Sequence, residues 1–95
     1  MRLGAQEASA IREDILRSDP EAKVYLYGSR TDDSARGGDI DLLVVSDEIG
    51  FRDVLRLRAA ILDRIGWQQL DLLVRRSNQL NEPLAASARE SGIEL

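Results

Sequence analysis

The sequence contains no cysteine and no histidine among its 95 residues. Without cysteine there can be no disulfide and no thiolate zinc site, and without histidine the commonest base and metal ligand near neutral pH is missing. Any catalysis by this chain therefore depends on the side chains of Asp, Glu, Ser, Tyr, Lys or Arg.

The chain also lacks an excess of basic residues and a long apolar run. The chain has 17 acidic and 13 basic residues and a net charge of −4. It lacks the positive footprint of a general nucleic-acid binder, so no direct nucleic-acid binding is expected. No apolar run approaches the roughly 20 residues that span a bilayer, and no signal peptide is recognised. We expect a cytoplasmic protein without membrane contact, folded as one domain over residues 1–95.

The spacing of the apolar residues alternates between the helical and the strand period. The sequence "SDP" at 18–20 predicts a helix end because proline cannot continue a helix, and Gly66 predicts a left-handed cap after another helix. The expected elements, in order, are helix 5–18, strand 23–27, a turn-rich loop 28–38, strand 39–45, helix 51–65, strand 69–74 and a helix over about 82–91. This alternation indicates a small α/β sheet with helices packed on it.

Three aromatic residues have structural interpretations. Tyr25 and Tyr27 are expected to pack against or line the sheet rather than to react. Trp67 is interpreted as a core or rim anchor, whereas an exposed position would make it a contact for a partner protein.

Two aspartates lie within the expected strand 39–45, where carboxylates are unfavourable. Asp39 and Asp41 are two residues apart, so their side chains lie on the same face of the strand. An unpaired buried carboxylate is costly. A hard divalent cation such as Mg²⁺, which takes oxygen ligands and substrate phosphates, offsets that cost. The sequence therefore predicts Mg²⁺ at Asp39 and Asp41.

A third carboxylate, Asp71, follows the same alternation in the expected strand 69–74. If this strand neighbours the strand of Asp39 and Asp41, all three carboxylates lie on one surface. Three acidic groups around two metal ions suit the in-line displacement of a phosphoryl group.

A structural alternative remains open for the same residues. Asp39 and Asp41 could cap turns, and Asp71 could form a surface salt bridge with Arg75 or Arg76. Short motifs often match by chance, so the aspartates alone do not decide between the two interpretations.

A turn suited to phosphate binding precedes the aspartates. Gly28 directly follows strand 23–27, and glycine lets the backbone approach a ligand while neighbouring N–H groups point at phosphate oxygens. Ser29 adds a hydroxyl donor. Arg30 and Arg36 can reach a triphosphate, and arginine suits bidentate phosphate contacts. The alternative for both arginines is a solvated loop charge paired with a neighbouring aspartate.

The stretch "YGSRTDDSARGGDIDLLVV" resembles the Gly-Ser…Asp-x-Asp signature of the polymerase-beta-like nucleotidyltransferase superfamily, and the chain is similar to its minimal branch. The resemblance implies a small mixed sheet of three to four strands with flanking helices. It also implies that Gly28 and Ser29 hold the triphosphate of ATP or another NTP, and that Asp39 and Asp41 bind Mg²⁺. Asp71 would bind the metal shared with the acceptor hydroxyl.

The resemblance also suggests a biological role. Members of this size are often encoded beside helical HEPN-domain proteins as antitoxins, and some transfer AMP to a tyrosine of that partner. The implied function is a Mg²⁺-dependent protein adenylyltransferase that acts as an antitoxin, alone or in a homo- or hetero-oligomer. Two alternatives remain. The first is an antitoxin that blocks its partner by covering it and whose aspartates have no catalytic role, and the second is a structural domain without a ligand. The complete motif favours the enzyme, because occlusion needs none of these residues.

Overall fold

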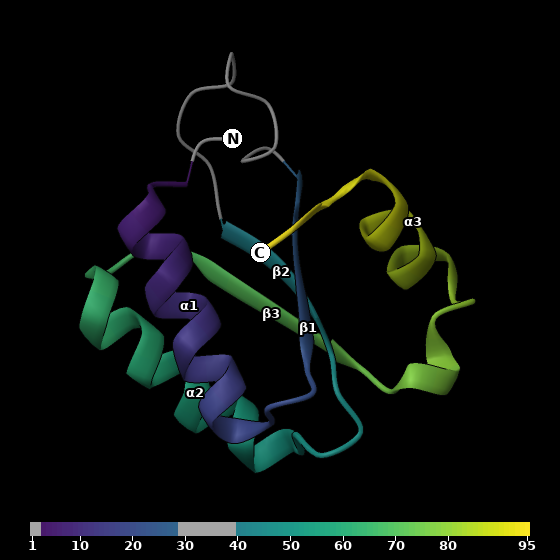
Figure 1. The fold of residues 1–95 in the computed structure, drawn as a ribbon, viewed down its shortest axis with the longest axis horizontal. Coiled ribbons are helices and arrows are strands. Elements are labelled where there is room, and N and C mark those ends of the chain that lie inside the picture. The colour runs from purple at the N-terminus through teal and green to yellow at the C-terminus, as the bar shows by residue number, and fades with distance from the viewer. Residues whose placement is uncertain (1–2, 29–39) are drawn as a thin grey trace.

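The computed structural model describes residues 3–28 and 40–95, which form an α/β fold with a four-stranded mixed sheet and three flanking helices (Figure 1). The elements in chain order are α1 (Ala5–Ser18), β1 (Lys23–Tyr27), β2 (Ile40–Val45), α2 (Phe51–Ile65), β3 (Leu70–Arg75), the short 3₁₀ turn η2 (Ser77–Gln79), α3 (Pro83–Ser91) and β4 (Ile93–Glu94). The fold class expected from the sequence is confirmed.

Local signals in the sequence explain where the helices begin and end. The backbone of Asp19 is extended, with φ −151°, directly before the proline that ends α1, and α3 begins at Pro83. Helix α2 ends at Ile65 and is capped by Gly66. Gly66 has the positive φ expected of a left-handed cap, 87°, but its ψ of 166° is extended, so the prediction of a left-handed conformation is wrong. Across the described ranges, no helix combines the length and hydrophobicity needed to span a membrane.

The sheet has the strand order β3-β2-β1-β4. Strand β1 pairs antiparallel with β2 and with β4, whereas β2 and β3 are parallel and are connected through α2. The register places Asp41 beside Asp71 on one side and beside Tyr27 on the other. The strands of Asp41 and Asp71 are therefore neighbours, as a common acidic surface requires.

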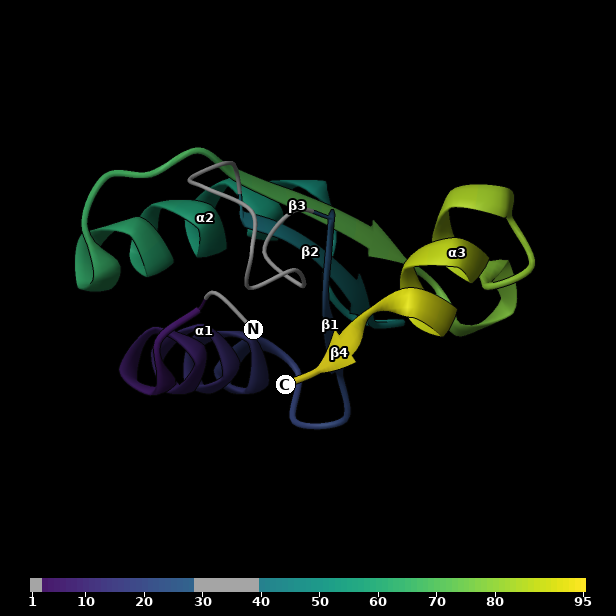
Figure 2. The same cartoon turned by 90° about the horizontal axis from the view of Figure 1, so that it is seen from above.

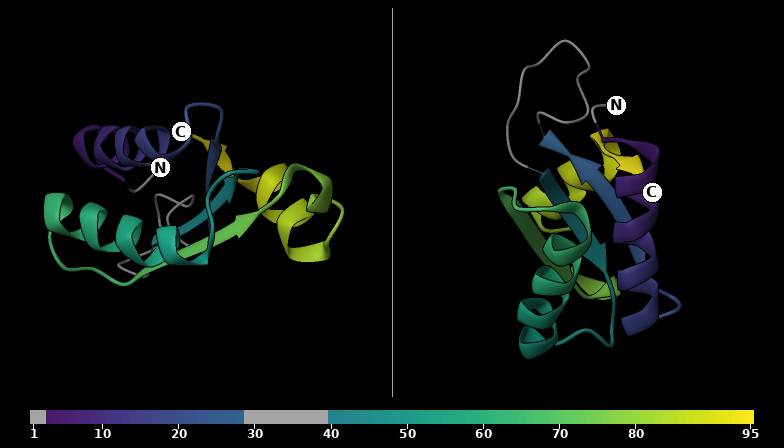
Figure 3. Two further views of the ribbon diagram at one scale, coloured as in Figure 1. Left: turned by 90° about the horizontal axis from the view of Figure 1, so that it is seen from below. Right: turned by 90° about the vertical axis from the view of Figure 1, so that its left-hand side faces the viewer.

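The two faces of the sheet are covered by different helices. Figure 2 shows α1 and α2 on one side of the sheet and α3 on the other, and Figure 3 shows α1 and α2 lying side by side. The larger apolar core lies under α1 and α2; its fully buried members include Ile11, Ile15, Leu26, Ile40, Leu42, Val44 and Ile61. A smaller cluster lies under α3 and contains Leu43, Ala85 and Ala88 with Tyr25 and Tyr27 packed against it.

Trp67 lies on the surface. It is 77% exposed, and the guanidinium carbon of Arg58 lies 5.8 Å from the centroid of its ring. The expectation of a core or rim anchor is therefore wrong, and Trp67 has the exposed position for which the sequence suggests a contact with a partner protein. The indole instead receives a cation–π contact from a residue of α2.

Candidate active site

Asp41 and Asp71 lie side by side on the face of the sheet that carries Tyr27. They occupy opposite positions in the parallel ladder between β2 and β3, and neighbouring strands are about 4.8 Å apart. Asp41 is half-buried and Asp71 is exposed. Two carboxylates held this close repel each other, and a divalent cation is the ligand that removes such repulsion.

Tyr27 completes this acidic part of the sheet. It lies opposite Asp41 in the antiparallel ladder between β1 and β2. Burial raises the pKa of the Tyr27 phenol, the negative charges of Asp41 and Asp71 raise it further, and the positive charge of Arg75 opposes them. The phenol therefore lies within the field of both carboxylates. The sequence had indicated a packing role for Tyr27, which the structure confirms, but not its position beside Asp41.

Gly28 brings the backbone directly against the Asp41 carboxylate. Its φ is 78°, in the region that favours glycine. A Cβ atom built on Gly28 would overlap Oδ2 of Asp41. The missing side chain therefore leaves room for the carboxylate beside the start of the loop where phosphate binding is predicted.

The arginines required by the structural alternative for Asp71 have other partners. Nε of Arg75 forms an ion pair with Oε1 of Glu82 at 2.7 Å. Nη1 of Arg76 donates hydrogen bonds of 2.9 Å to the carbonyl oxygens of Ser46 and Ile49. These contacts tie the end of β3 to α3 and to the connection before α2.

Several predicted site residues lie outside the described ranges. These are Ser29, Arg30, Arg36 and Asp39. Within residues 3–28 and 40–95 no group of three or more acidic side chains that could hold a metal ion is found, and the predicted triad needs Asp39. The structure thus brings together Gly28, Asp41 and Asp71, and their oxygen donors fit the requirements of Mg²⁺.

Comparison with known proteins identifies the class of protein that this fold and acidic pair represent. The model of the nucleotidyltransferase domain family matches residues 8–87, and the chain belongs to this family. The family reaction is nucleotidyl transfer from a nucleoside triphosphate, usually with a divalent metal ion.

A solved structure supports the fold assignment. The crystal structure of a protein described as a "putative nucleotidyltransferase" is similar with a TM-score of 0.59 and 24% sequence identity, covering 95% of this chain and 96% of that chain. No curated protein matches the sequence.

Proposed function

We propose that this chain is a Mg²⁺-dependent nucleotidyltransferase that moves AMP from ATP to a hydroxyl group. The acceptor in this proposal is a tyrosine of a HEPN-type helical protein, for which the chain acts as an antitoxin. The observation that carries the catalytic part is the pair of carboxylates, Asp41 and Asp71, in register on neighbouring strands, with the backbone of Gly28 against Asp41.

The carboxylates have distinct tasks in this proposal. Asp39, Asp41 and Asp71 hold Mg²⁺, which neutralises charge on the triphosphate when it is bound. Asp41 is half-buried beside Gly28, which supports a role on the nucleotide side. Asp71 is exposed, which supports a role on the side where a protein acceptor arrives.

The phosphate contacts are assigned to the segment that begins at Gly28. The backbone N–H groups that follow Gly28 and the hydroxyl of Ser29 donate to phosphate oxygens. Arg30 and Arg36 neutralise the triphosphate through their guanidinium groups.

The transfer forms one bond and breaks one. The acceptor oxygen bonds to the α-phosphorus of ATP, the bond from that phosphorus to the bridging oxygen breaks, and pyrophosphate leaves. The acceptor hydroxyl must also lose its proton, and the chain has no histidine to accept it. We assign this proton to the Asp71 carboxylate, and the exposure of Asp71 supports that role.

Transfer of label from ATP to the partner protein tests the proposal. The purified chain, Mg²⁺ and labelled ATP are incubated with the product of the adjacent gene, and intact-mass spectrometry of that product reports an added nucleoside monophosphate. We expect transfer by the wild type and a rate at least about 100-fold lower with Asp71→Asn, the low end for loss of a general base. Asp63→Asn, an exposed change on α2, is the matched control and keeps the wild-type rate.

The same variant separates the enzyme from an occluding antitoxin. If Asp71→Asn loses label transfer and also fails to neutralise the partner in cells, the chemistry is the antitoxin mechanism. If it still neutralises the partner, occlusion is the working mechanism. Transfer by Asp71→Asn at the wild-type rate would overturn the assigned role of this carboxylate.

A further inference from the structure

Strand β3 lies at the edge of the sheet but has the sequence of a central strand. Its sequence is nearly identical to that of β2, residue by residue along the ladder that joins the two strands. The paired residues are Ile40 and Leu70, Asp41 and Asp71, Leu42 and Leu72, Leu43 and Leu73, and Val44 and Val74. In β2, Leu42, Leu43 and Val44 are fully buried, whereas their partners in β3 are only half-buried. Continuous apolar runs are typical of strands covered on both sides, and an apolar edge strand is a template for pairing with another strand.

The hydrogen bonds to β2 determine which backbone groups of β3 face outward. The N–H of Ile40 donates to the carbonyl of Gln69, and the N–H of Ser46 donates to the carbonyl of Arg75. Backbone groups of successive residues in a strand point to opposite sides, so the odd-numbered residues of β3 bond to β2. The N–H and C=O groups of the even-numbered residues 70, 72 and 74 therefore point away from the sheet.

Arginine side chains cover the two ends of this edge. Nε of Arg58 donates to the carbonyl of Leu70 at 3.1 Å, and Nη1 of Arg75 donates to the carbonyl of Val74 at 2.9 Å. The Val74 carbonyl keeps a second lone pair for another donor. Leu72 lies between the two covered carbonyls, at the centre of the edge.

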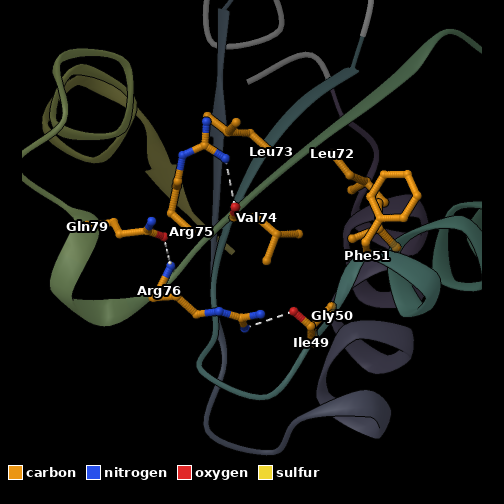
Figure 4. Close-up of a pocket in the computed structure, with 10 residues that line it drawn as sticks. Ile49, Gly50, Phe51, Leu72, Leu73, Val74, Arg75, Arg76 and Gln79 are labelled. Carbon is orange, nitrogen blue, oxygen red and sulfur yellow. Dashed lines mark hydrogen bonds between the residues drawn. The ribbon is translucent and has the colours of Figure 1, made fainter.

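An apolar groove accompanies the edge. It has a volume of about 430 Å³, and Figure 4 shows Phe51 from the start of α2 beside Leu72, with Val74 and then Arg76 further along the chain. Phe51 is 80% exposed, and Leu55, one turn later in α2, is 60% exposed. The edge of β3 thus lies next to the exposed side chain of Phe51.

We propose that two copies of this chain dimerise by antiparallel pairing of β3 with β3 about a two-fold axis at Leu73. In this register Leu72 of the first copy exchanges two backbone hydrogen bonds with Val74 of the second. By the two-fold symmetry, Val74 of the first copy exchanges two more with Leu72 of the second. The two four-stranded sheets become one continuous sheet, and the half-buried apolar residues of β3 pack beside β3 of the second copy.

Charge complementarity selects this register and this partner. With the axis at Leu73, Asp71 of each copy lies opposite Arg75 of the other, on the same face, so two pairs of opposite charges form. With the axis at Leu72, Asp71 would lie opposite Leu73 and neither charge would be paired. A strand with an acidic and a basic residue placed symmetrically about its centre is complementary to a second copy of itself.

The dimer adds a residue to the candidate active site. In this dimer the second copy's Arg75 lies next to Asp71, one of the predicted metal ligands. Its Nε stays paired with Glu82 and its Nη1 with the Val74 carbonyl, so Nη2 is the nitrogen that meets Asp71 or a phosphate bound there. Because pairing of β3 requires no nucleotide, this inference is tested separately from the proposed transfer reaction.

Cysteine cross-linking tests the register directly, since the chain has no cysteine of its own. At Leu73 the two copies form a non-hydrogen-bonded antiparallel pair with Cα atoms about 4.5 Å apart, within the range for a disulfide. We expect Leu73→Cys to form a covalent dimer of twice 10.6 kDa on mild oxidation. Leu72→Cys is the matched control: its two copies are diagonal neighbours about 7–8 Å apart and stay uncoupled. Absence of the Leu73→Cys dimer, or equal coupling by both variants, would overturn the proposal.

A charge exchange provides an independent test by sedimentation velocity. We expect a dimer for the wild type and a dimer dissociation constant at least about 10-fold higher for Asp71→Arg or Arg75→Asp, because like charges then face each other. The double variant Asp71→Arg/Arg75→Asp restores the dimer. Circular dichroism verifies that each variant is folded.

Two control variants make the same kinds of charge change away from β3, on α1 and on the opposite edge strand β4. Arg12→Asp on α1 and Glu94→Arg on β4 are exposed positions and leave the dimer unchanged. A monomeric wild type at every concentration, or a folded double variant that stays monomeric, would contradict the pairing of β3.

Discussion

Gly28 and Gly66 both have positive φ angles, 78° and 87°, but only one of them touches the candidate active site. A Cβ on Gly28 would overlap the Asp41 carboxylate, whereas a Cβ on Gly66 would meet nothing within 4 Å. The two glycines thus separate the effect of backbone strain from the effect of crowding at Asp41.

The comparison leads to a prediction for alanine at each position. Both Gly28→Ala and Gly66→Ala should lower the free energy of unfolding by about 1–3 kcal/mol, the cost of a positive φ angle for a residue with a Cβ. Only Gly28→Ala should also weaken the binding of Mg-ATP, because the Asp41 carboxylate must move. Thermal unfolding and calorimetric titration of the two variants measure the two effects. Equal Mg-ATP affinity in both would show that Gly28 serves only the turn.

At the level of single residues, the sequence predicted what depends on local alternation. Asp41 and Asp71 were assigned to one face by the two-residue period of strands, and the structure places them there. Tyr27 was not connected with them, because its position beside Asp41 follows from the antiparallel register of β1 and β2, which no local pattern specifies.

At the level of elements, one buried hydroxyl joins the end of α1 to the end of β2. Oγ of Ser46 donates to Oδ2 of Asp19 at 2.6 Å and accepts hydrogen bonds from the N–H groups of Glu48 and Ile49 at 3.1 and 3.0 Å. Ser46 and Asp19 are both buried. The hydroxyl therefore satisfies a buried carboxylate and fixes the turn that leads into α2.

Removing this hydroxyl should destabilise the fold. We expect Ser46→Ala to lower the free energy of unfolding by about 1–3 kcal/mol, since the Asp19 carboxylate and two backbone N–H groups lose a partner in a buried place. Ser77→Ala removes an exposed hydroxyl that bonds to Asp47 and should change stability by less than about 0.5 kcal/mol. Urea denaturation gives both values. A decrease in the free energy of unfolding for Ser46→Ala no greater than that for Ser77→Ala would contradict the role of the Ser46 hydroxyl.

Element boundaries were predictable where a local stop signal exists. Helix α1 and strand β1 have the expected bounds, because Pro20 and Gly28 interrupt the chain next to them. Strand β3 is displaced by one residue, to Leu70–Arg75, because its end is set by the ladder with β2 and not by a turn signal. Strand β4 is only two residues long, and such a short strand has no periodicity of its own.

At the scale of the whole molecule, the two faces of the sheet have different compositions. The face under α1 and α2 is a continuous apolar core, and the face under α3 ends in Tyr27, Asp41 and Asp71. The acidic residues are thus placed where the smaller cluster ends, so changes to them leave the main core intact. A variant that loses a carboxylate is expected to remain folded, or to become slightly more stable because repulsion between Asp41 and Asp71 is relieved.

Calorimetric titration with Mg-ATP tests most directly whether the acidic end of the sheet binds a metal–nucleotide complex. The wild type and the control Asp63→Asn should bind Mg-ATP with the same affinity, whereas Asp39→Asn and Asp41→Asn should show no binding while unfolding at the wild-type temperature or above. Mg-ATP affinity that is unchanged in both Asp39→Asn and Asp41→Asn would contradict the account.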